Sequence, residues 1–242
     1  MKQLFNQLIS FPYFFKIAQI SFPYLFLLSI FVILLGVLWG VFFSPVDATQ
    51  GEVYRIIYLH VPAASVAQSI YYTMVIASIT YLIWRIKMAS VFMISMAPLG
   101  AIFTFLALFT GAVWGQPTWG TWWVWDARLT SMLILFLLFM GYIALSNAFE
   151  KSERGSRPAA LLAIAGSINL PIVKFSVDWW STLHQPASIM RTGGVSIDSS
   201  MLLPLVIMFL AFQLFFILII IFRSHSILIE RKMQHLKIMG KL

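Results

Sequence analysis

The sequence predicts an all-α polytopic membrane protein with six transmembrane helices. Of the 242 residues, 61% are hydrophobic and only 10% are charged, a balance that is not typical of soluble domains. Six apolar stretches are each long enough to cross the hydrocarbon layer of a membrane. No repeat, low-complexity segment or linker divides the chain, so we expect a single integral-membrane domain over residues 1–242.

Short charged loops or longer polar loops separate the expected spans. The segment before the first span carries Lys2 and Lys16 among apolar residues, and it is expected to lie at the membrane interface rather than to be a cleaved signal peptide. The fifth span contains Asn169 and Pro171, which predict a kink that neighbouring helices satisfy. A basic amphipathic tail follows the last span. In chain order the spans are residues 22–43, 53–84, 91–113, 129–149, 159–177 and 201–222.

The positive charges predict which side each loop faces. All but four of the 16 Lys and Arg residues fall in the two tails, the loop after the second span and the loop after the fourth. Because basic residues are retained on the cytoplasmic side, we expect both termini in the cytoplasm. The opposite, periplasmic side keeps Arg55, Arg128, Lys174 and Arg191. The net charge of +8 therefore indicates topology and not nucleic-acid binding.

Residues 114–130, with the sequence WGQPTWGTWWVWDARLT, form a tryptophan-rich segment that we expect to be a periplasmic loop. Tryptophan favours the boundary between hydrocarbon and water, so a heavy aromatic belt is one interpretation. Many large flat side chains interspersed with Gly and Pro also suit a platform for a flat apolar ligand. The segment contains five of the nine tryptophans: Trp114, Trp119, Trp122, Trp123 and Trp125.

The four histidines fall into two topological pairs. His60, near the outer end of the second span, and His184, in the last outer loop, are expected on the periplasmic side, whereas His225 and His235 lie in the cytoplasmic tail. Two neutral imidazoles can hold a haem iron from opposite faces. Because the chain has no cysteine, a C-x-x-C-H attachment site is excluded, and haem would bind non-covalently as b-type haem. The alternatives are a buried, hydrogen-bonded His60 and a solvated His184.

Two arginines on the same side suit the carboxylates that haem carries. Arginine binds a carboxylate through two hydrogen bonds and stays charged when partly desolvated, so Arg55 and Arg128 are candidates for holding the propionates. Arg191 is a weaker candidate. The alternative is pairing within the protein, of Arg55 with Glu52 or of Arg128 with Asp126. We expect Asp126 to contribute to the site by fixing the loop rather than by touching iron.

Motifs for several other activities are absent from the sequence. It has no G-x-x-x-x-G-K-[ST] phosphate loop, so the chain is not expected to hydrolyse ATP itself. It also has no H-E-x-x-H motif and no nucleophile elbow. Few ionisable residues lie in the middle of the spans, which gives little indication of a proton or ion relay. We therefore do not expect an enzyme.

The tryptophan-rich segment resembles the "WWD" signature of the haem-handling proteins of cytochrome c biogenesis. The chain length, the six spans, YLHVPAAS around His60 and VKFSVDWWSTLHQPAS around His184 resemble the cytochrome c maturation protein C (haem exporter protein C) family over nearly the whole chain. The resemblance implies that haem lies on the outer side against residues 114–130, with His60 and His184 as its axial ligands.

The resemblance also implies a function at the periplasmic face of the bacterial inner membrane. There, family members present haem to a periplasmic haem chaperone, beside an ABC-type ATPase, its membrane partner and a small membrane subunit. Three rival functions stay open: a b-type cytochrome that transfers electrons, a permease that carries haem through its own bundle, and an assembly subunit with an aromatic belt. The first usually places its histidines inside the bundle, and the second needs a polar line along the spans.

Overall fold

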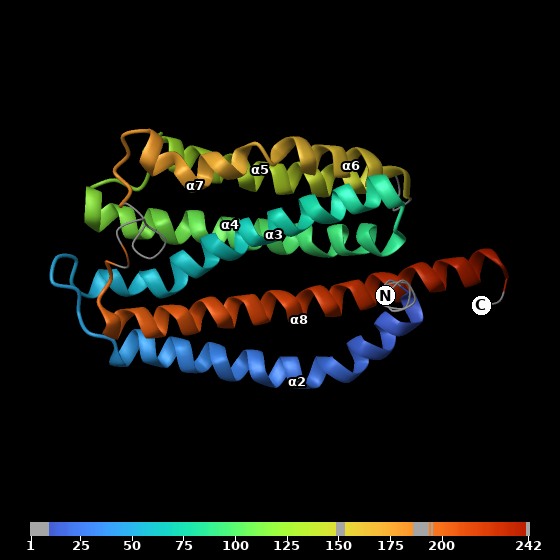
Figure 1. The fold of residues 1–242 in the computed structure, drawn as a ribbon, viewed down its shortest axis with the longest axis horizontal. Coiled ribbons are helices and arrows are strands. Elements are labelled where there is room, and N and C mark those ends of the chain that lie inside the picture. The colour runs from blue at the N-terminus through green and yellow to red at the C-terminus, as the bar shows by residue number, and fades with distance from the viewer. Residues whose placement is uncertain (1–9, 149–152, 186–193, 195, 241–242) are drawn as a thin grey trace.

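The computed structural model describes residues 10–148, 153–185, 194 and 196–240, which form helices and short connections (Figure 1). No strand occurs within these ranges, which confirms the all-α prediction. In chain order the elements are α2 (Phe11–Leu38), the π-helix η1 (Trp39–Phe43), the 3-10 helix η2 (Glu52–Ile56), α3 (Ile57–Trp84), α4 (Lys87–Trp119), α5 (Ala127–Asn147), α6 (Glu153–Gly166), α7 (Asn169–Trp179) and α8 (Ser199–Ile238).

Six helical segments are long and apolar enough to cross a membrane, which confirms the predicted number of spans within the described part of the chain. Most of them extend past the expected boundaries, because hydropathy marks only the part of a helix that suits hydrocarbon, whereas the helical backbone continues through the interface. The segments are Phe11–Phe43, Glu52–Trp84, Lys87–Trp119, Ala127–Asn147, Gly155–Trp179 and Ser199–Ile238.

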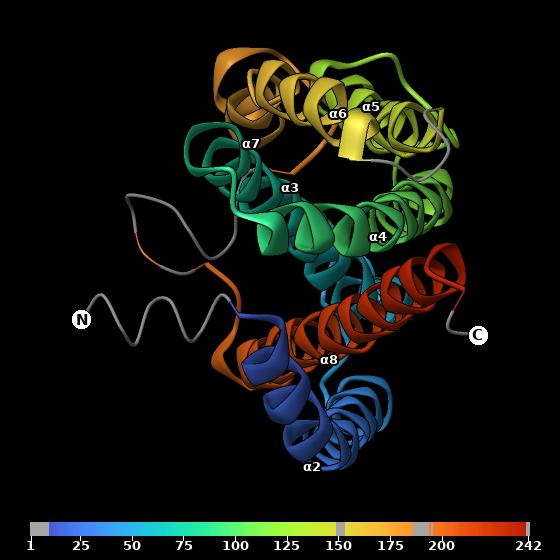
Figure 2. The same cartoon turned by 90° about the vertical axis from the view of Figure 1, so that its right-hand side faces the viewer.

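The helices are arranged in three layers (Figure 2). α2 and α8 form one layer, α3 and α4 form the middle one, and α5 with α6 and α7 forms the third. α2 packs chiefly against α8, whereas α3 and α4 pack against each other and against the helices of both outer layers. The middle layer is therefore the core of the bundle, and α4 is the most deeply buried of the spans.

The two ends of the bundle contain different connections (Figure 1). One end holds η1, η2, the connection between α4 and α5, and the end of α7. The other holds the start of α2, the turn between α3 and α4, and the end of α8. We call the first the tryptophan end. The two outer loops of the sequence prediction thus begin at the same end of the molecule.

α4 and α5 approach each other closely at Gly100. A Cβ added to Gly100 would lie 2.1 Å from Cε1 of Phe139, a fully buried side chain of α5. The ring of Phe139 also meets Tyr71 of α3 edge-on, with the ring centroids 5.1 Å apart. Helices in a membrane associate largely by such close packing around small residues. This contact therefore fixes three of the spans relative to one another.

The fifth span is built from two helices, with a break at residues 167 and 168. Asn169 begins α7, and its side-chain amide donates a hydrogen bond of 2.8 Å to the backbone carbonyl of Ser131 in α5. Pro171 lies in the first turn of α7, where backbone N–H groups have no partner within the helix. The neighbouring helix therefore stabilises the interruption, as expected for a kink in a membrane span.

The described parts of both tails extend the first and last spans. α2 begins at Phe11 and bends along its length (Figure 1), and Pro23 inside it removes one helical hydrogen bond. α8 continues to Ile238, past the predicted end of the sixth span. Its Leu228 is buried in a small cluster with Phe14 and other residues of α2 and α4. This cluster closes the end of the bundle opposite the tryptophan end.

Candidate functional site

His60 lies in the first turn of α3 and faces α4. Its Nδ1 is 3.0 Å from Oγ1 of Thr110, and that hydroxyl donates its own proton to the carbonyl of Leu106 at 2.7 Å. The threonine oxygen therefore accepts the Nδ1–H of His60, which leaves the free lone pair of the imidazole on Nε2. A Cβ on Gly111 would come within 3.0 Å of Cε1 of His60, so the glycine makes room for the ring.

His184 lies in the connection that follows α7. Its Nδ1 is 2.9 Å from the backbone carbonyl oxygen of Gln185, and its backbone N–H donates to Oγ1 of Thr182 at 2.9 Å. A carbonyl only accepts hydrogen bonds, so Nδ1 of His184 carries the proton and Nε2 has the free lone pair. Both histidines are thus held as the tautomer in which Nε2 is available to a metal.

The two imidazoles lie next to each other at the tryptophan end. Their ring centroids are 6.3 Å apart, and the ring planes are inclined by 34°. Two imidazoles that bind one metal through bonds of about 2.0–2.1 Å place their centroids about 6–6.5 Å apart. The separation therefore fits one metal between the rings. Nδ1 is the ring nitrogen that bonds Thr110 in His60 and the carbonyl of Gln185 in His184.

The surroundings of His184 favour its neutral form. Burial, and to a smaller extent the positive charge of Arg128, lower the pKa of His184 from its ordinary value of 6.5 to about 4. Asp126 opposes this effect more weakly. At neutral pH the imidazole is therefore uncharged, which is the form that binds metals. The prediction of a solvated loop histidine does not describe this environment.

Two tryptophans contact the histidine pair, and both lie on α4. Trp114 meets His60 edge-on, with centroids 5.6 Å apart and planes at 82°, and its indole N–H donates to Oε1 of Gln50 at 2.7 Å. Trp119, in the last turn of the helix, has its ring 5.9 Å from that of His184. α4 thus extends further than expected, and the loop proper is confined to residues 120–126.

The other three tryptophans lie in this loop. Trp123 and Trp125 pack edge-to-face with centroids 5.4 Å apart. Trp125 is 75% exposed and Trp122 is 60% exposed, so their faces are open to the surroundings. The five tryptophans therefore form two groups: Trp114 and Trp119 contact the imidazoles, whereas the loop group lies at the rim of the tryptophan end.

Asp126 and Arg128 take different roles at the start of α5. Oδ1 of Asp126 accepts the backbone N–H of Leu129 at 2.7 Å and caps the helix, as expected for a residue that fixes the loop. Arg128 is half-buried and acts electrostatically on both His60 and His184. It donates no hydrogen bond to a described residue, so no such bond ties it to Asp126. Asp126 and Asp178 act on Arg128 electrostatically, without a hydrogen bond between described residues that would fix its guanidinium.

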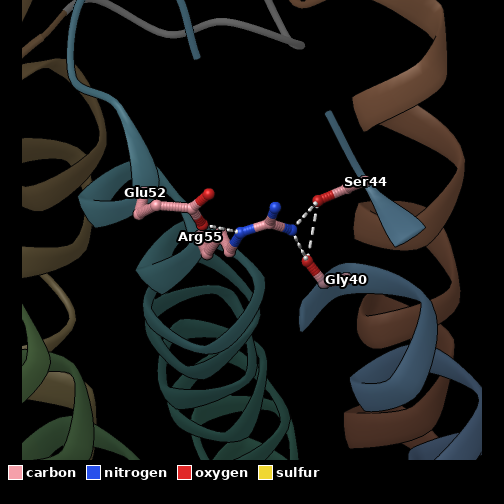
Figure 3. A network of polar contacts seen from close by, with 4 residues as sticks. All are labelled: Gly40, Ser44, Glu52 and Arg55. Atoms are coloured by element: carbon pink, nitrogen blue, oxygen red, sulfur yellow. Dashed lines mark hydrogen bonds and ion pairs between the residues drawn. The ribbon is translucent and has the colours of Figure 1, made fainter. Parts of the chain in front are cut away.

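Arg55 is held within the protein (Figure 3). Its Nε pairs with Glu52, and one terminal nitrogen donates to the carbonyl of Gly40 at 3.1 Å and to Oγ of Ser44 at 2.9 Å. These contacts join η2, which precedes α3, to η1 and its C-cap residue Ser44. Of the two interpretations of Arg55, pairing with Glu52 is the one that the geometry supports.

The remaining candidates lie elsewhere. The ring of His225 packs against Phe15 of α2 with centroids 4.7 Å apart, and His235 is in the last turn of α8. Both are at the opposite end of the bundle from His60, as the topology argument predicted. Arg191 lies outside the described residues.

Sequence reasoning missed the residues that hold the site in place. Thr110, Gly111 and Gln50 contact His60 or Trp114, although 50 positions separate Thr110 from His60 and 64 separate Gln50 from Trp114. A polar residue next to a glycine near the outer end of an apolar span is a weak signal, and it could have drawn attention to Thr110.

Comparison with known proteins shows the family. The family model described as heme exporter protein C matches residues 4–239. The chain is 48% identical over 209 residues to heme exporter protein C of Bradyrhizobium diazoefficiens, which covers 86% of this chain and 80% of the relative. It is 47% identical over 205 residues to heme exporter protein C of Escherichia coli K12, covering 85% and 82%.

A third relative comes from a plant. A ccmC-like mitochondrial protein of Marchantia polymorpha, named for cytochrome c biosynthesis, is 44% identical over 208 residues, which covers 84% of this chain and 86% of the relative. The matches extend over nearly the whole length described above and include both α3 and the connection that carries His184. The chain therefore belongs to the heme exporter protein C family.

Proposed function

We propose that this protein binds haem at the periplasmic face of the bacterial inner membrane and presents it to a periplasmic haem chaperone for the assembly of c-type cytochromes. The observation that carries the proposal is the histidine pair. His60 and His184 lie with ring centroids 6.3 Å apart, each with Nδ1 engaged and Nε2 left to bind a metal. The names of the relatives support haem export and cytochrome c assembly as the process that this site serves.

The donor set favours haem over a bare metal ion. Among the described residues, no group of three or more His, Cys, Asp or Glu side chains could hold a metal ion. Two imidazoles are nevertheless sufficient for haem, because the porphyrin supplies the remaining ligands. The apolar rings of Trp114 and Trp119 beside the two histidines suit the face of a macrocycle.

The propionates would be held chiefly by Arg128. Its charge acts on both histidines, and its guanidinium donates no hydrogen bond to a described residue. Arg55, which is bonded to Glu52, Gly40 and Ser44, would contribute through its remaining nitrogen. Trp122, Trp123 and Trp125 would cover the outer edge of the bound haem, with Asp126 fixing the loop that carries them.

The partners follow from the same proposal. Presentation at an outward loop requires an apo-chaperone that takes haem away. The resemblance adds an ABC-type ATPase, its membrane partner and a small membrane subunit. The chain itself has no phosphate-binding loop, so ATP would be hydrolysed by that partner. The lipid-facing spans would anchor the complex in the bilayer.

A spectroscopic experiment tests the site. The purified full-length protein, loaded with haem, should show a six-coordinate low-spin spectrum. His60→Gly and His184→Gly should each open one axial position, and added free imidazole should restore the low-spin spectrum. His235→Gly is the matched control and should change nothing, because His235 lies at the other end of the bundle. An unchanged spectrum in both single variants would show that other residues ligate the iron.

A transfer experiment tests the role. Mixing the loaded protein with the purified apo-chaperone should move haem from one to the other, and both the rate and the extent should be measurable by separating the two proteins. Stable low-spin haem that never leaves the protein, but is reduced and reoxidised by electron carriers, would instead identify a membrane cytochrome.

A further inference from the structure

The hydrogen bonds at Nδ1 of His60 and His184 involve different kinds of partner, a side chain and a backbone carbonyl. Nδ1 of His184 is bonded to a backbone carbonyl, which no side-chain substitution can remove. Nδ1 of His60 is bonded to a side chain, Thr110 of α4. Thr110 is buried, and its hydroxyl also bonds the carbonyl of Leu106 at 2.7 Å. The hydroxyl proton therefore has a fixed acceptor, and the oxygen presents a lone pair to the imidazole.

We propose that Thr110 is a positioning residue for haem: by accepting the Nδ1–H of His60, it fixes the tautomer, orientation and donor strength of that axial ligand. The inference rests on the proposed function, in which His60 binds the iron. Metal-binding histidines generally donate their second ring N–H to an oxygen, which orients the ring and raises its basicity. Thr110 provides that oxygen from a neighbouring span.

The bond has a specific consequence for ligand chemistry. A neutral imidazole carries one proton, and when that proton is on Nε2 the nitrogen that faces away from Thr110 cannot bind a metal. An acceptor at Nδ1 selects the useful tautomer. Gly111, the next residue of α4, lies so close to the ring that an added Cβ would stand 3.0 Å from Cε1 of His60, so a larger residue would require the ring to shift. Thr110 therefore holds the ring of His60 by a hydrogen bond, and Gly111 leaves space for it.

The nearest rival acceptor is the backbone of α4 itself. The carbonyl of Ala107 also interacts with His60, and it lies 3.3 Å from Oγ1 of Thr110. If that carbonyl were the effective partner, removing the hydroxyl would change nothing at the iron. The proposal therefore makes a distinct prediction about the threonine side chain.

The test uses Thr110→Val and Thr110→Ser in the full-length protein loaded with haem. Valine keeps the shape but cannot accept a hydrogen bond, so the variant should bind haem about 10–100-fold more weakly. The midpoint potential of the haem that remains bound should shift upward, because a less basic imidazole stabilises the ferric iron less. Serine restores the hydroxyl and should return both quantities towards the wild-type values.

Thr104→Val provides a matched control. Thr104 is buried on the same helix and its hydroxyl bonds the carbonyl of Gly100 at 2.7 Å, with no hydrogen bond to a histidine among the described residues. This variant loses the same kind of bond within the helix and should leave haem affinity and midpoint potential unchanged. A potential that shifts equally in Thr104→Val and Thr110→Val would attribute the effect to the helix and overturn the proposal.

A double-mutant cycle separates this inference from the proposed function. In a His60→Gly background, Thr110→Val should produce no further change in the haem spectrum or potential, because the residue acts through the imidazole. If His60→Gly alters the spectrum and Thr110→Val alone does not, the positioning role fails while axial ligation by His60 stands. If His60→Gly itself leaves the spectrum unchanged, both fail.

Discussion

Gln50 accepts a hydrogen bond of 2.7 Å from the indole N–H of Trp114, although 64 positions separate the two residues. The bond links the first outer loop to α4. Trp114 in turn meets His60 edge-on and Tyr54 edge-on, with centroid distances of 5.6 Å and 5.9 Å. A residue that is remote from the tryptophan-rich segment in sequence therefore sets the orientation of the tryptophan nearest to His60.

Replacing Gln50 with leucine should disturb the site from this loop. The partly buried indole N–H would lose its partner, which costs about 1–3 kcal/mol when the group stays buried. We expect a lower thermal unfolding midpoint and weaker haem binding, both measured on the detergent-solubilised protein. Trp114→Phe in the Gln50→Leu background should recover part of the stability, because phenylalanine has no donor to satisfy. Equal haem affinity in Gln50→Leu and wild type would contradict a role for this bond.

Substitution of Arg128 should weaken haem binding only when the haem carboxylates are free, whereas the effect of substituting Arg55 should not depend on them. Arg128→Gln should weaken the binding of haem by about tenfold or more, since hydrogen bonds between charged groups contribute about 1.5–3 kcal/mol. With haem dimethyl ester, which lacks free carboxylates, Arg128→Gln should bind as tightly as wild type. Titration of both ligands by absorbance checks this.

Arg55→Gln serves as the comparison for the same pair of ligands. Because Arg55 is bonded to Glu52, Gly40 and Ser44, its loss should loosen the junction of η1 and η2 and affect both ligands alike. A difference between haem and its ester that appears in Arg55→Gln, and not in Arg128→Gln, would reverse the assignment of the propionate partner.

The packing at Gly100 predicts a large change in stability from a small substitution. Gly100→Ala places a methyl group 2.1 Å from the ring of Phe139, and such overpacking costs about 1–3 kcal/mol. Gly141→Ala is the control, because its Cβ would meet Leu162 at an ordinary 3.4 Å. Thermal unfolding should separate the two variants, and Phe139→Leu should rescue the first. Similar midpoints for Gly100→Ala and Gly141→Ala would contradict the packing argument.

The pKa of His184 predicts how haem binding depends on pH. A free histidine would be protonated below about pH 6.5, but here the pKa is lowered to about 4, so the neutral, metal-binding form persists into the acid range. Ligation by His184 should therefore be insensitive to pH between about 8 and 5 and be lost only below about pH 4, because bound iron competes with the proton for Nε2. Absorbance of the low-spin form, compared between wild type and His184→Gly, measures this. A transition near pH 6.5 would show that His184 is solvated.

Reporter fusions test which face carries the site. Fusions after Trp84 should be active only with a cytoplasmic reporter, and fusions after Gly120 only with a periplasmic reporter, because the basic residues concentrate at the opposite end from the tryptophans. A fusion after Lys151 should give the cytoplasmic result, and a fusion after Gly193 the periplasmic one. A cytoplasmic signal at Gly120 would be incompatible with presentation of haem to a periplasmic partner.

Hydropathy was sufficient for the number of spans, and the order of the spans predicted that His60 and His184 lie at the same end of the bundle. Each depends on how residues partition between hydrocarbon and water, which sequence reports directly. Hydropathy was insufficient for predicting where the helices end. Trp114 and Trp119 continue α4 at the interface, where tryptophan is as favourable in a helix as in a loop.

The hydrogen-bonding partners also could not be predicted from the sequence. Arg55 had two plausible partners, an external carboxylate or Glu52, and the position of η1 relative to η2 favours the bonds within the protein. The hydroxyls of Thr104 and Thr110 both donate to a backbone carbonyl of α4. The sequence alone does not show which of the two threonines also bonds a histidine. Such choices depend on contacts between spans that are distant along the chain.

The origin of the two imidazoles on different parts of the chain has a consequence for biosynthesis. His60, Thr110 and Trp114 all belong to the hairpin of α3 and α4, which leaves the ribosome well before the connection that follows α7. Domains and hairpins generally form in the order of their synthesis. In a nascent chain, His60 would thus be positioned by its contacts before His184 has been synthesised. Under the proposed function, both histidine ligands would be present only when insertion is nearly finished, so six-coordinate haem would be expected on completed chains and not on nascent ones.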